Sequence, residues 1–234
     1  MAGRRARLSI IPVVVIAAVA LAVRPVVVDQ LLPSIAGQGM TVAYQGVVQA
    51  LGLLIAVAVL AVTFGLTDRA SRGYWGIGQP AAPARRVRWL GIREGVSWRR
   101  LGAVMLGWIS VLLAGFLYLG LSDRLTGRVS PVVLLLAVVF AIINAVTEEA
   151  VFRLSLVSSL HGVVSDRVIL PLGAGIFGAV HYVGVPGGPV GVVMAAFLGW
   201  FLTKSILETR GVFWAILIHF VQDVIIFAML FHVV

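Results

Sequence analysis

The chain has 234 residues, of which 61% are hydrophobic and only 12% are charged. This composition excludes an ordinary soluble domain and is typical of a polytopic membrane protein. The formal net charge of +9 does not indicate nucleic-acid binding, because the arginines lie in loops beside apolar runs, as the positive-inside rule describes. The chain has no cysteine, which excludes a disulfide framework, a thiolate metal site and a cysteine nucleophile.

Apolar runs of about 20 residues predict an all-α, polytopic transmembrane helical bundle of about seven spans. The first run follows Arg4, Arg5 and Arg7, as in a signal peptide. Its apolar character resumes beyond Arg24 and Pro25, so we expect an uncleaved anchor that is kinked at the proline. The expected spans cover residues 8–32, 42–66, 101–121, 130–160, 168–183, 190–207 and 212–233.

The segment between the second and third spans, residues 67–100, is expected to be a cytoplasmic loop. It carries eight arginines against two acidic residues, and the N-terminus is basic as well. The positive-inside rule then predicts a multi-pass protein of the plasma membrane whose N-terminus is cytoplasmic. The preference for arginine over lysine, together with the abundance of alanine and glycine, favours a bacterial source.

Three of the expected spans carry ionisable residues near their middles, where each buried charge is costly. A lone intramembrane histidine or ion pair would be explained by hydrogen bonding between helices. Six such residues on three spans indicate a functional site instead. They are Glu148, Glu149 and Arg153 in the fourth span, His181 in the fifth, and His219 and Asp223 in the seventh.

Helical spacing divides the two glutamates between different faces. Glu149 and Arg153 are four residues apart and share a face, so an ion pair is available to them. Glu148 is rotated by about 100° from Glu149 and aligns with Asn144 and Phe152. We therefore expect Glu149 to have a partner and Glu148 to be left for chemistry.

The predicted depths bring the remaining groups together. Glu148 and His181 are each about 20 Å from the cytoplasmic ends of their spans, and His219 is about 12 Å from its own, at 1.5 Å per helical residue. His219 and Asp223 share a face, being four residues apart. These residues are expected to meet in a cavity between helices that opens to the cytoplasm.

Two kinds of chemistry suit such a cavity. His181 and His219 with a carboxylate could hold a hydrolytic zinc ion. Alternatively, Glu148 could act directly as a general base on water, without a metal, while the histidines stabilise the oxyanion. If all groups are ionised, the site holds three carboxylates, of Glu148, Glu149 and Asp223, and one guanidinium, of Arg153. The excess of two negative charges requires protons, a charged histidine or a divalent metal. Zn²⁺ and no cofactor both remain open.

Three short motifs carry a family resemblance. EEAVFR at 148–153 matches EExxxR, FGAVH at 177–181 matches FxxxH, and HFVQD at 219–223 matches Hxxx followed by Asn or Asp. In this order along the chain, on three apolar segments, they resemble the CPBP family of intramembrane proteases, also called the Abi or CAAX-protease-like family, which includes the CAAX prenyl endopeptidases. The resemblance covers about residues 130–233. It implies a protease core at 129–234, preceded by N-terminal helices and the basic loop at 1–128, within a single membrane-embedded domain.

The resemblance implies an intramembrane endopeptidase, glutamic or metallo, that hydrolyses a peptide or membrane-protein substrate. Glu148 would activate water, assisted by His181 and His219. Asp223 would stabilise the oxyanion or orient a histidine, although the eukaryotic CAAX enzymes have Asn there and an ionised Asp cannot donate a hydrogen bond. The supporting residues would be Glu149, Arg153, Asn144 and Phe177.

Two other classes of protein remain as alternatives: a proton- or ion-coupled transporter, and a non-catalytic immunity or scaffold protein. The sequence shows neither an inverted repeat nor a matched pair of interrupted helices, which disfavours a transporter. The expected partners are the lipid bilayer and a peptide or membrane-protein substrate, without nucleic acid. Only a protease predicts that Glu148→Gln abolishes function while the folded protein stays in the membrane.

Overall fold

The computed structural model describes residues 6–32, 34, 42–125 and 130–231. Within these residues the chain is helical and forms no β-strand, and six helices are long and apolar enough to cross a membrane. The protein is therefore the polytopic α-helical bundle that its composition predicts. Its elements are α2 (Ile10–Leu31), α3 (Val42–Leu66), η1 (Ser71–Trp75), η2 (Arg88–Leu90), α4 (Trp98–Leu121), η3 (Ser122–Arg124), α5 (Pro131–Glu149), η4 (Ala150–Leu154), α6 (Ser155–Leu160), α7 (Asp166–Val180), η5 (His181–Val183), α8 (Gly188–Thr209) and α9 (Phe213–Leu230).

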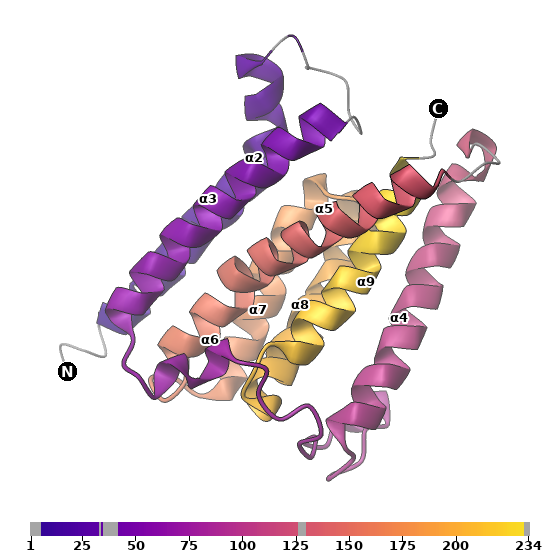
Figure 1. Ribbon diagram of the computed structural model, residues 1–234. Helices are drawn as coiled ribbons and strands as arrows, with labels where there is room; N and C mark the ends of the chain where they lie inside the picture. The colour runs from indigo at the N-terminus through magenta and orange to yellow at the C-terminus, as the bar shows by residue number, and fades with distance from the viewer. Residues whose placement is uncertain (1–5, 33, 35–41, 126–129, 232–234) are drawn as a thin grey trace.

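The helices run up and down between two ends of the molecule (Figure 1). Helix α3 packs on α2 and α5, α5 packs on α9, and α9 packs on α4, while α7 and α8 form a closely packed hairpin that also contacts α9. The largest apolar cluster draws residues from α2, α3, α4 and α6 to α9, so early and late helices share one core. The domain boundary predicted between residues 128 and 129 lies outside the described residues.

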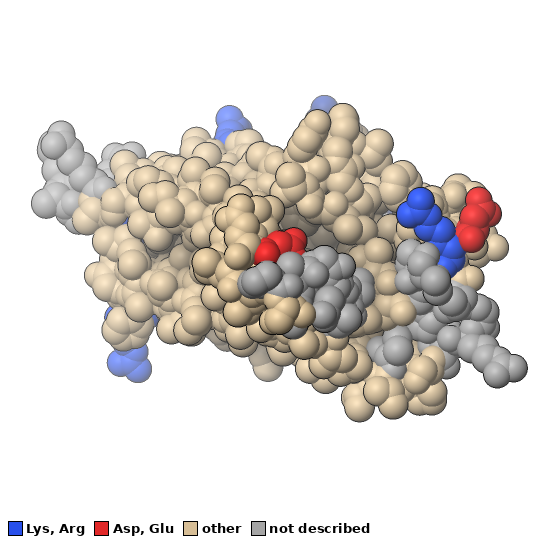
Figure 2. Space-filling view, turned by 90° about the horizontal axis from the view of Figure 1, so that it is seen from above, with Lys and Arg blue, Asp and Glu red and all other residues tan. Residues whose placement is uncertain are grey.

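Charge is distributed unevenly between the two ends. The loop that precedes α4 lies at the lower end, together with the start of α2 and the end of α8 (Figure 1). Seen from above, the opposite end shows few charged side chains (Figure 2). The basic loop and the start of α2 thus share one end, as the arginine pattern predicts.

Helix α7 begins before residue 168 and ends before residue 183, so it is shifted relative to the span expected at 168–183. Its 15 residues extend about 22 Å, less than the roughly 30 Å of a bilayer core. Small residues seat it tightly on α8: a Cβ at Gly173 would lie 2.3 Å from Oγ1 of Thr203, and one at Gly178 would lie 2.8 Å from Cβ of Ala196. Because α7 ends early, His181 in the turn that follows is placed within the bundle, beside a cavity.

Candidate active site

The two glutamates lie where one long helix changes its winding. Helix α5 ends at Glu149, five residues of π-helix follow as η4, and α6 continues to Leu160. Short π-turns inside α-helices are rare and occur frequently at functional sites. The ion pair expected from the spacing is present: Nη1 of Arg153 donates to Oε1 of Glu149 at 2.8 Å, with the two side chains 0% and 1% exposed.

Phe177 of α7 contacts three of the motif side chains. The guanidinium carbon of Arg153 lies 3.6 Å from the centre of the Phe177 ring, which is a cation–π contact. The ring centres of His181 and His219 lie 4.2 and 5.7 Å from that of Phe177. Since Phe177 is buried, its ring fixes the spacing between the two histidines and the arginine.

His219 lies among three carboxylates. Its Nδ1 is 2.7 Å from Oε1 of Glu149, so this nitrogen is the one that carries a proton. Its Nε2 is 3.6 Å from Oε2 of Glu148 and 3.6 Å from Oδ2 of Asp223. The contact of His219 with Glu149 is thus shorter than its contact with Asp223, the residue that the sequence interpretation considered for orienting a histidine.

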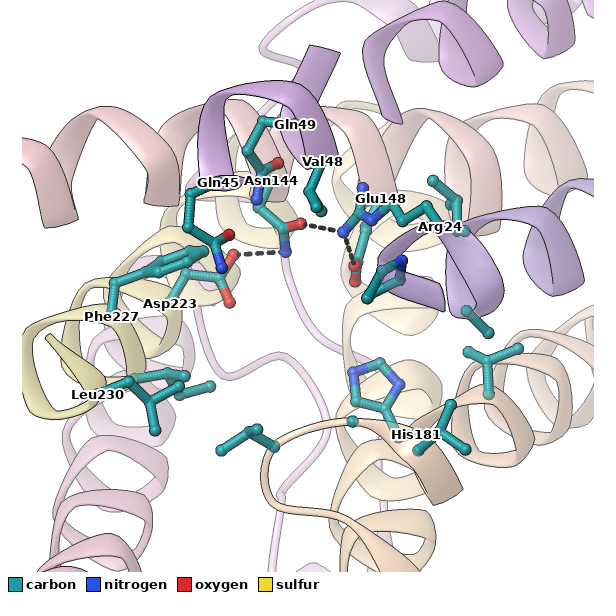
Figure 3. Close-up of a pocket in the computed structure, with 18 of the residues that line it drawn as sticks. Arg24, Gln45, Val48, Gln49, Asn144, Glu148, His181, Asp223, Phe227 and Leu230 are labelled. Carbon is teal, nitrogen blue, oxygen red and sulfur yellow. Dashed lines mark hydrogen bonds and ion pairs between the residues drawn. The ribbon is translucent and has the colours of Figure 1, made fainter. Parts of the chain in front are cut away.

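Arg24 of α2 also enters the site, and the sequence interpretation missed it. Its Nη2 donates to Oδ1 of Asn144 at 2.8 Å and lies 3.7 Å from Oε1 of Glu148. Nδ2 of Asn144 in turn donates to Oδ2 of Asp223 at 3.1 Å. Asn144 thus connects α2 to α9 through hydrogen bonds on both sides of its amide (Figure 3).

The signal for Arg24 was present in the sequence. An arginine inside the apolar run 8–32 is as costly in lipid as the glutamates that identified the site. Its charge also corrects the expected balance. Two guanidinium groups, on Arg24 and Arg153, face the carboxylates of Glu148, Glu149 and Asp223, so the excess is one negative charge rather than two. One protonated histidine is enough to balance it.

Two cavities adjoin the cluster. The first, of about 260 Å³, is lined by Glu148 and Asn144 and also by Gln45 and Gln49 of α3, two further polar residues that the sequence interpretation missed (Figure 3). The second, of about 150 Å³, is mostly apolar and includes His219 among its lining residues. His181 and Asp223 line both cavities. The predicted site residues are thus brought together where a polar and an apolar cavity meet.

A zinc ion does not fit the arrangement of these side chains. Catalytic zinc sites use three protein ligands with an open fourth position. In the described parts of the chain, no group of three or more His, Cys, Asp or Glu side chains could hold a metal ion. His181, one of the two predicted ligands, directs its Nδ1 to the carbonyl oxygen of Phe177 at 2.8 Å, a contact that is compatible with a ligand as well as with a metal-free role for its Nε2.

Comparison with known families supports the motif pattern. Residues 128–225 match the family model described as type II CAAX prenyl endopeptidase Rce1-like. This segment, called the CPBP segment below, is therefore similar to the CPBP family of CAAX-type endopeptidases. The CPBP segment contains every motif residue named above, from α5 to α9, whereas Arg24, Gln45 and Gln49 lie before it. No curated protein and no solved structure matches the chain significantly. The family that this segment resembles is one of CAAX-type endopeptidases, which hydrolyse peptide substrates.

Proposed function

We propose that this protein hydrolyses a peptide bond in the cavity beside Glu148, with that carboxylate as the general base. The observation that carries the proposal is the position of Glu148. It lines the 260 Å³ cavity, is only 9% exposed, and has an Oε2 without a hydrogen-bond partner among the described residues. A buried carboxylate beside a cavity, with one oxygen that accepts no hydrogen bond, is suited to deprotonate a water molecule there.

The hydrogen bonds of the two histidines assign their tautomers. A carbonyl oxygen can only accept, so Nδ1 of His181 carries the proton that it donates to Phe177. Nδ1 of His219 likewise donates to the Glu149 carboxylate. In each ring Nε2 is left for the reaction, as a proton acceptor in the neutral ring and a donor in the charged one.

These positions suggest a sequence of proton transfers. Glu148 takes a proton from water as the oxygen attacks the scissile carbonyl carbon. Protonated Nε2 of His219, held by Glu149, donates a hydrogen bond to the oxyanion that forms. The proton held by Glu148 then passes to the leaving amine as the C–N bond breaks, with Nε2 of His181 orienting the water. We assign water activation to Glu148 alone, because the donor set does not fit zinc.

Asp223 takes a supporting role in this proposal. Its Oδ2 accepts a hydrogen bond from the amide of Asn144. The same amide accepts a hydrogen bond from Arg24, so Asn144 connects the Asp223 carboxylate to the guanidinium of Arg24. An ionised carboxylate cannot donate to an oxyanion, which leaves that task to His219. We propose that Asp223 and Arg24 act as a compensating pair. Asp223 carries a negative charge where the eukaryotic CAAX enzymes have the neutral amide of Asn, and the guanidinium of Arg24 on α2 balances that charge.

We further propose that the basic end faces the cytoplasm of a bacterial plasma membrane, with residues 129–234 as the protease core. The uneven distribution of arginine along the sequence supports this orientation. In that orientation the N-terminus and the loop before α4 are cytoplasmic, and the end of α9 faces outward.

The test is peptide cleavage by purified, chelator-treated protein against a peptide library. Wild type should cleave without added metal, and Glu148→Gln should lower kcat by about 1,000-fold or more, while its melting temperature stays close to that of wild type. Glu94→Gln in the exposed loop removes the same charge outside the site and should retain activity. Activity that returns only with zinc would show that a metal, rather than Glu148 alone, activates water. Cleavage by Glu148→Gln at the rate of wild type would contradict the assignment of the base.

A further inference from the structure

A second polar cavity lies at the basic end of the molecule, away from the proposed active site. Its volume is about 520 Å³, and it is enclosed by the loop at 85–89, the start of α7 and the last turns of α8. None of the residues that line the proposed active site lines this cavity. Its cationic lining residues are Arg85, Arg86, Arg88, Arg167 and Lys204.

Only part of this positive charge is neutralised within the cavity. Arg85 pairs with Asp166 at 2.8 Å, and Lys204 pairs with Glu208. The other three cations are exposed, and their side chains form no hydrogen bond or ion pair with any residue that the structure describes. They are Arg86, Arg88 and Arg167. Three like charges around one cavity repel each other, so an anion is the ligand that the cavity would bind.

Aromatic side chains place this cavity at the level of lipid headgroups. Trp89 is 68% exposed, and its ring centre lies 5.2 Å from that of Trp200 on α8. Both tryptophans line the cavity. Paired indoles at the end of spanning helices are typical of the membrane–water interface.

An apolar stripe leads from the cavity toward the middle of the membrane. Lys204, Trp200, Phe197 and Val193 follow one another along α8 at intervals of four, three and four residues, so they share one face of the helix. Phe197 packs against Trp200 with ring centres 6.2 Å apart, and Val193 is 69% exposed. An acyl chain could pack along this apolar stripe, which starts next to the cationic side chains of the cavity.

We propose that this cavity binds the phosphate headgroup of an anionic phospholipid, with an acyl chain lying along the Val193–Phe197–Trp200 stripe of α8. Guanidinium groups hold phosphate by paired, charge-assisted hydrogen bonds, which the three uncompensated arginines can supply. A free phosphate ion would use the cations but not the stripe. The proposal is independent of proteolysis, since it concerns residues outside the active site.

Native mass spectrometry of the delipidated full chain in detergent tests this site. The probes are phosphatidylglycerol, phosphatidylcholine with the same chains, and inorganic phosphate. Wild type should bind phosphatidylglycerol at least about 10-fold more tightly than either other probe, because each arginine near an anionic headgroup contributes. The triple variant Arg86→Gln/Arg88→Gln/Arg167→Gln should lose about 10-fold to 100-fold in that affinity. Trp89→Ala, which leaves every charge in place, should lose a smaller factor.

The matched control is Arg69→Gln/Arg99→Gln/Arg100→Gln, which removes the same charge from exposed positions outside the cavity. This variant should bind phosphatidylglycerol as wild type does. Equal losses in the two triple variants would show attraction by net charge and would overturn the proposal of a built site. Inorganic phosphate bound as tightly as the lipid would reduce the cavity to an anion site without a lipid. Unchanged binding by the first variant would also overturn the proposal.

Discussion

The Glu149–Arg153 pair in the middle of the bundle and the Lys204–Glu208 pair near the end of α8 have the same spacing and similar burial, with no side chain more than 5% exposed. Their surroundings differ. Lys204 also donates to the carbonyl oxygen of Arg85, and Oε2 of Glu208 accepts from Nε1 of Trp98 at 2.9 Å. In the central pair, by contrast, Oε2 of Glu149 and both Nε and Nη2 of Arg153 have no hydrogen-bond partner among the described residues.

The two pairs thus differ in how completely their polar atoms are hydrogen-bonded. A buried polar group normally finds all its partners, and each that does not carries a desolvation cost. The pair on α8 forms further hydrogen bonds with the loop, to the carbonyl oxygen of Arg85 and from Nε1 of Trp98. These bonds hold the 85–98 segment against α8. The central pair keeps unused hydrogen-bonding capacity beside His219, which lines the apolar cavity, although neither Glu149 nor Arg153 lines a cavity itself.

The largest expected effect comes from breaking the central pair. Arg153→Ala leaves the Glu149 carboxylate buried without its cation, which should lower the free energy of unfolding by about 3–5 kcal/mol. Glu148→Gln is nearly isosteric and removes a charge, so it should change stability far less. Thermal melting of both variants in detergent measures the contrast. Comparable melting temperatures would contradict the roles assigned to the two glutamates.

Breaking the pair on α8 should have a smaller effect, because Glu208 keeps two other donors, Nε1 of Trp98 and the backbone N–H of Arg85. Lys204→Met retains an apolar stem and should cost about 1–3 kcal/mol. It should also release the loop from α8, so trypsin should cut among the arginines at 85–93 faster than in wild type, while peptide cleavage is retained. Limited trypsinolysis followed by mass spectrometry gives the rates. A loop that is as resistant as in wild type would show that Trp98 and Arg85 hold it unaided.

The compensation proposed between Arg24 and Asp223 predicts coupling. Arg24→Gln should destabilise wild type more than it destabilises Asp223→Asn, with a coupling energy of about 0.5–3 kcal/mol, because the amide removes the charge that the arginine balances. Thermal melting of wild type, the two single variants and the double variant gives the four stabilities of this double-mutant cycle. Strict additivity would mean that the two groups act separately.

The smallest loss of stability is expected from breaking the exposed ion pair between Arg85 and Asp166. The hydrogen bond to Asp166 raises the pKa of the Arg85 guanidinium above its ordinary value, but the arginine side chain is 65% exposed. Asp166→Asn should therefore cost only about 0.2–1 kcal/mol, and less in high salt. Melting at two salt concentrations checks this. A loss as large as that of Lys204→Met would mean that Asp166 has a further role.

The sequence predicted the helical bundle and the motif residues because ionisable groups are conspicuous in apolar runs. Other features have no such signal. The π-turn at 150–154 contains neither proline nor glycine, so its sequence gives no sign of a change in winding. The close contact of α7 with α8 depends on glycines that face each other only after folding. Lys204 and Glu208 fall at an expected span end, where charges are ordinary, so their burial could not be seen. Arg24 was visible but was interpreted as an interruption of its span.

The position of Arg24 on α2 has a consequence for biogenesis. Helices enter the membrane in the order in which the ribosome makes them, so α2 precedes the two glutamates by more than a hundred residues. The guanidinium is therefore already in the bilayer when the carboxylate of Glu148 arrives. A fragment that begins at residue 129 lacks this cation, so we expect its glutamate-bearing helix to insert less efficiently. Co-expression of residues 1–128 as a separate chain should restore insertion.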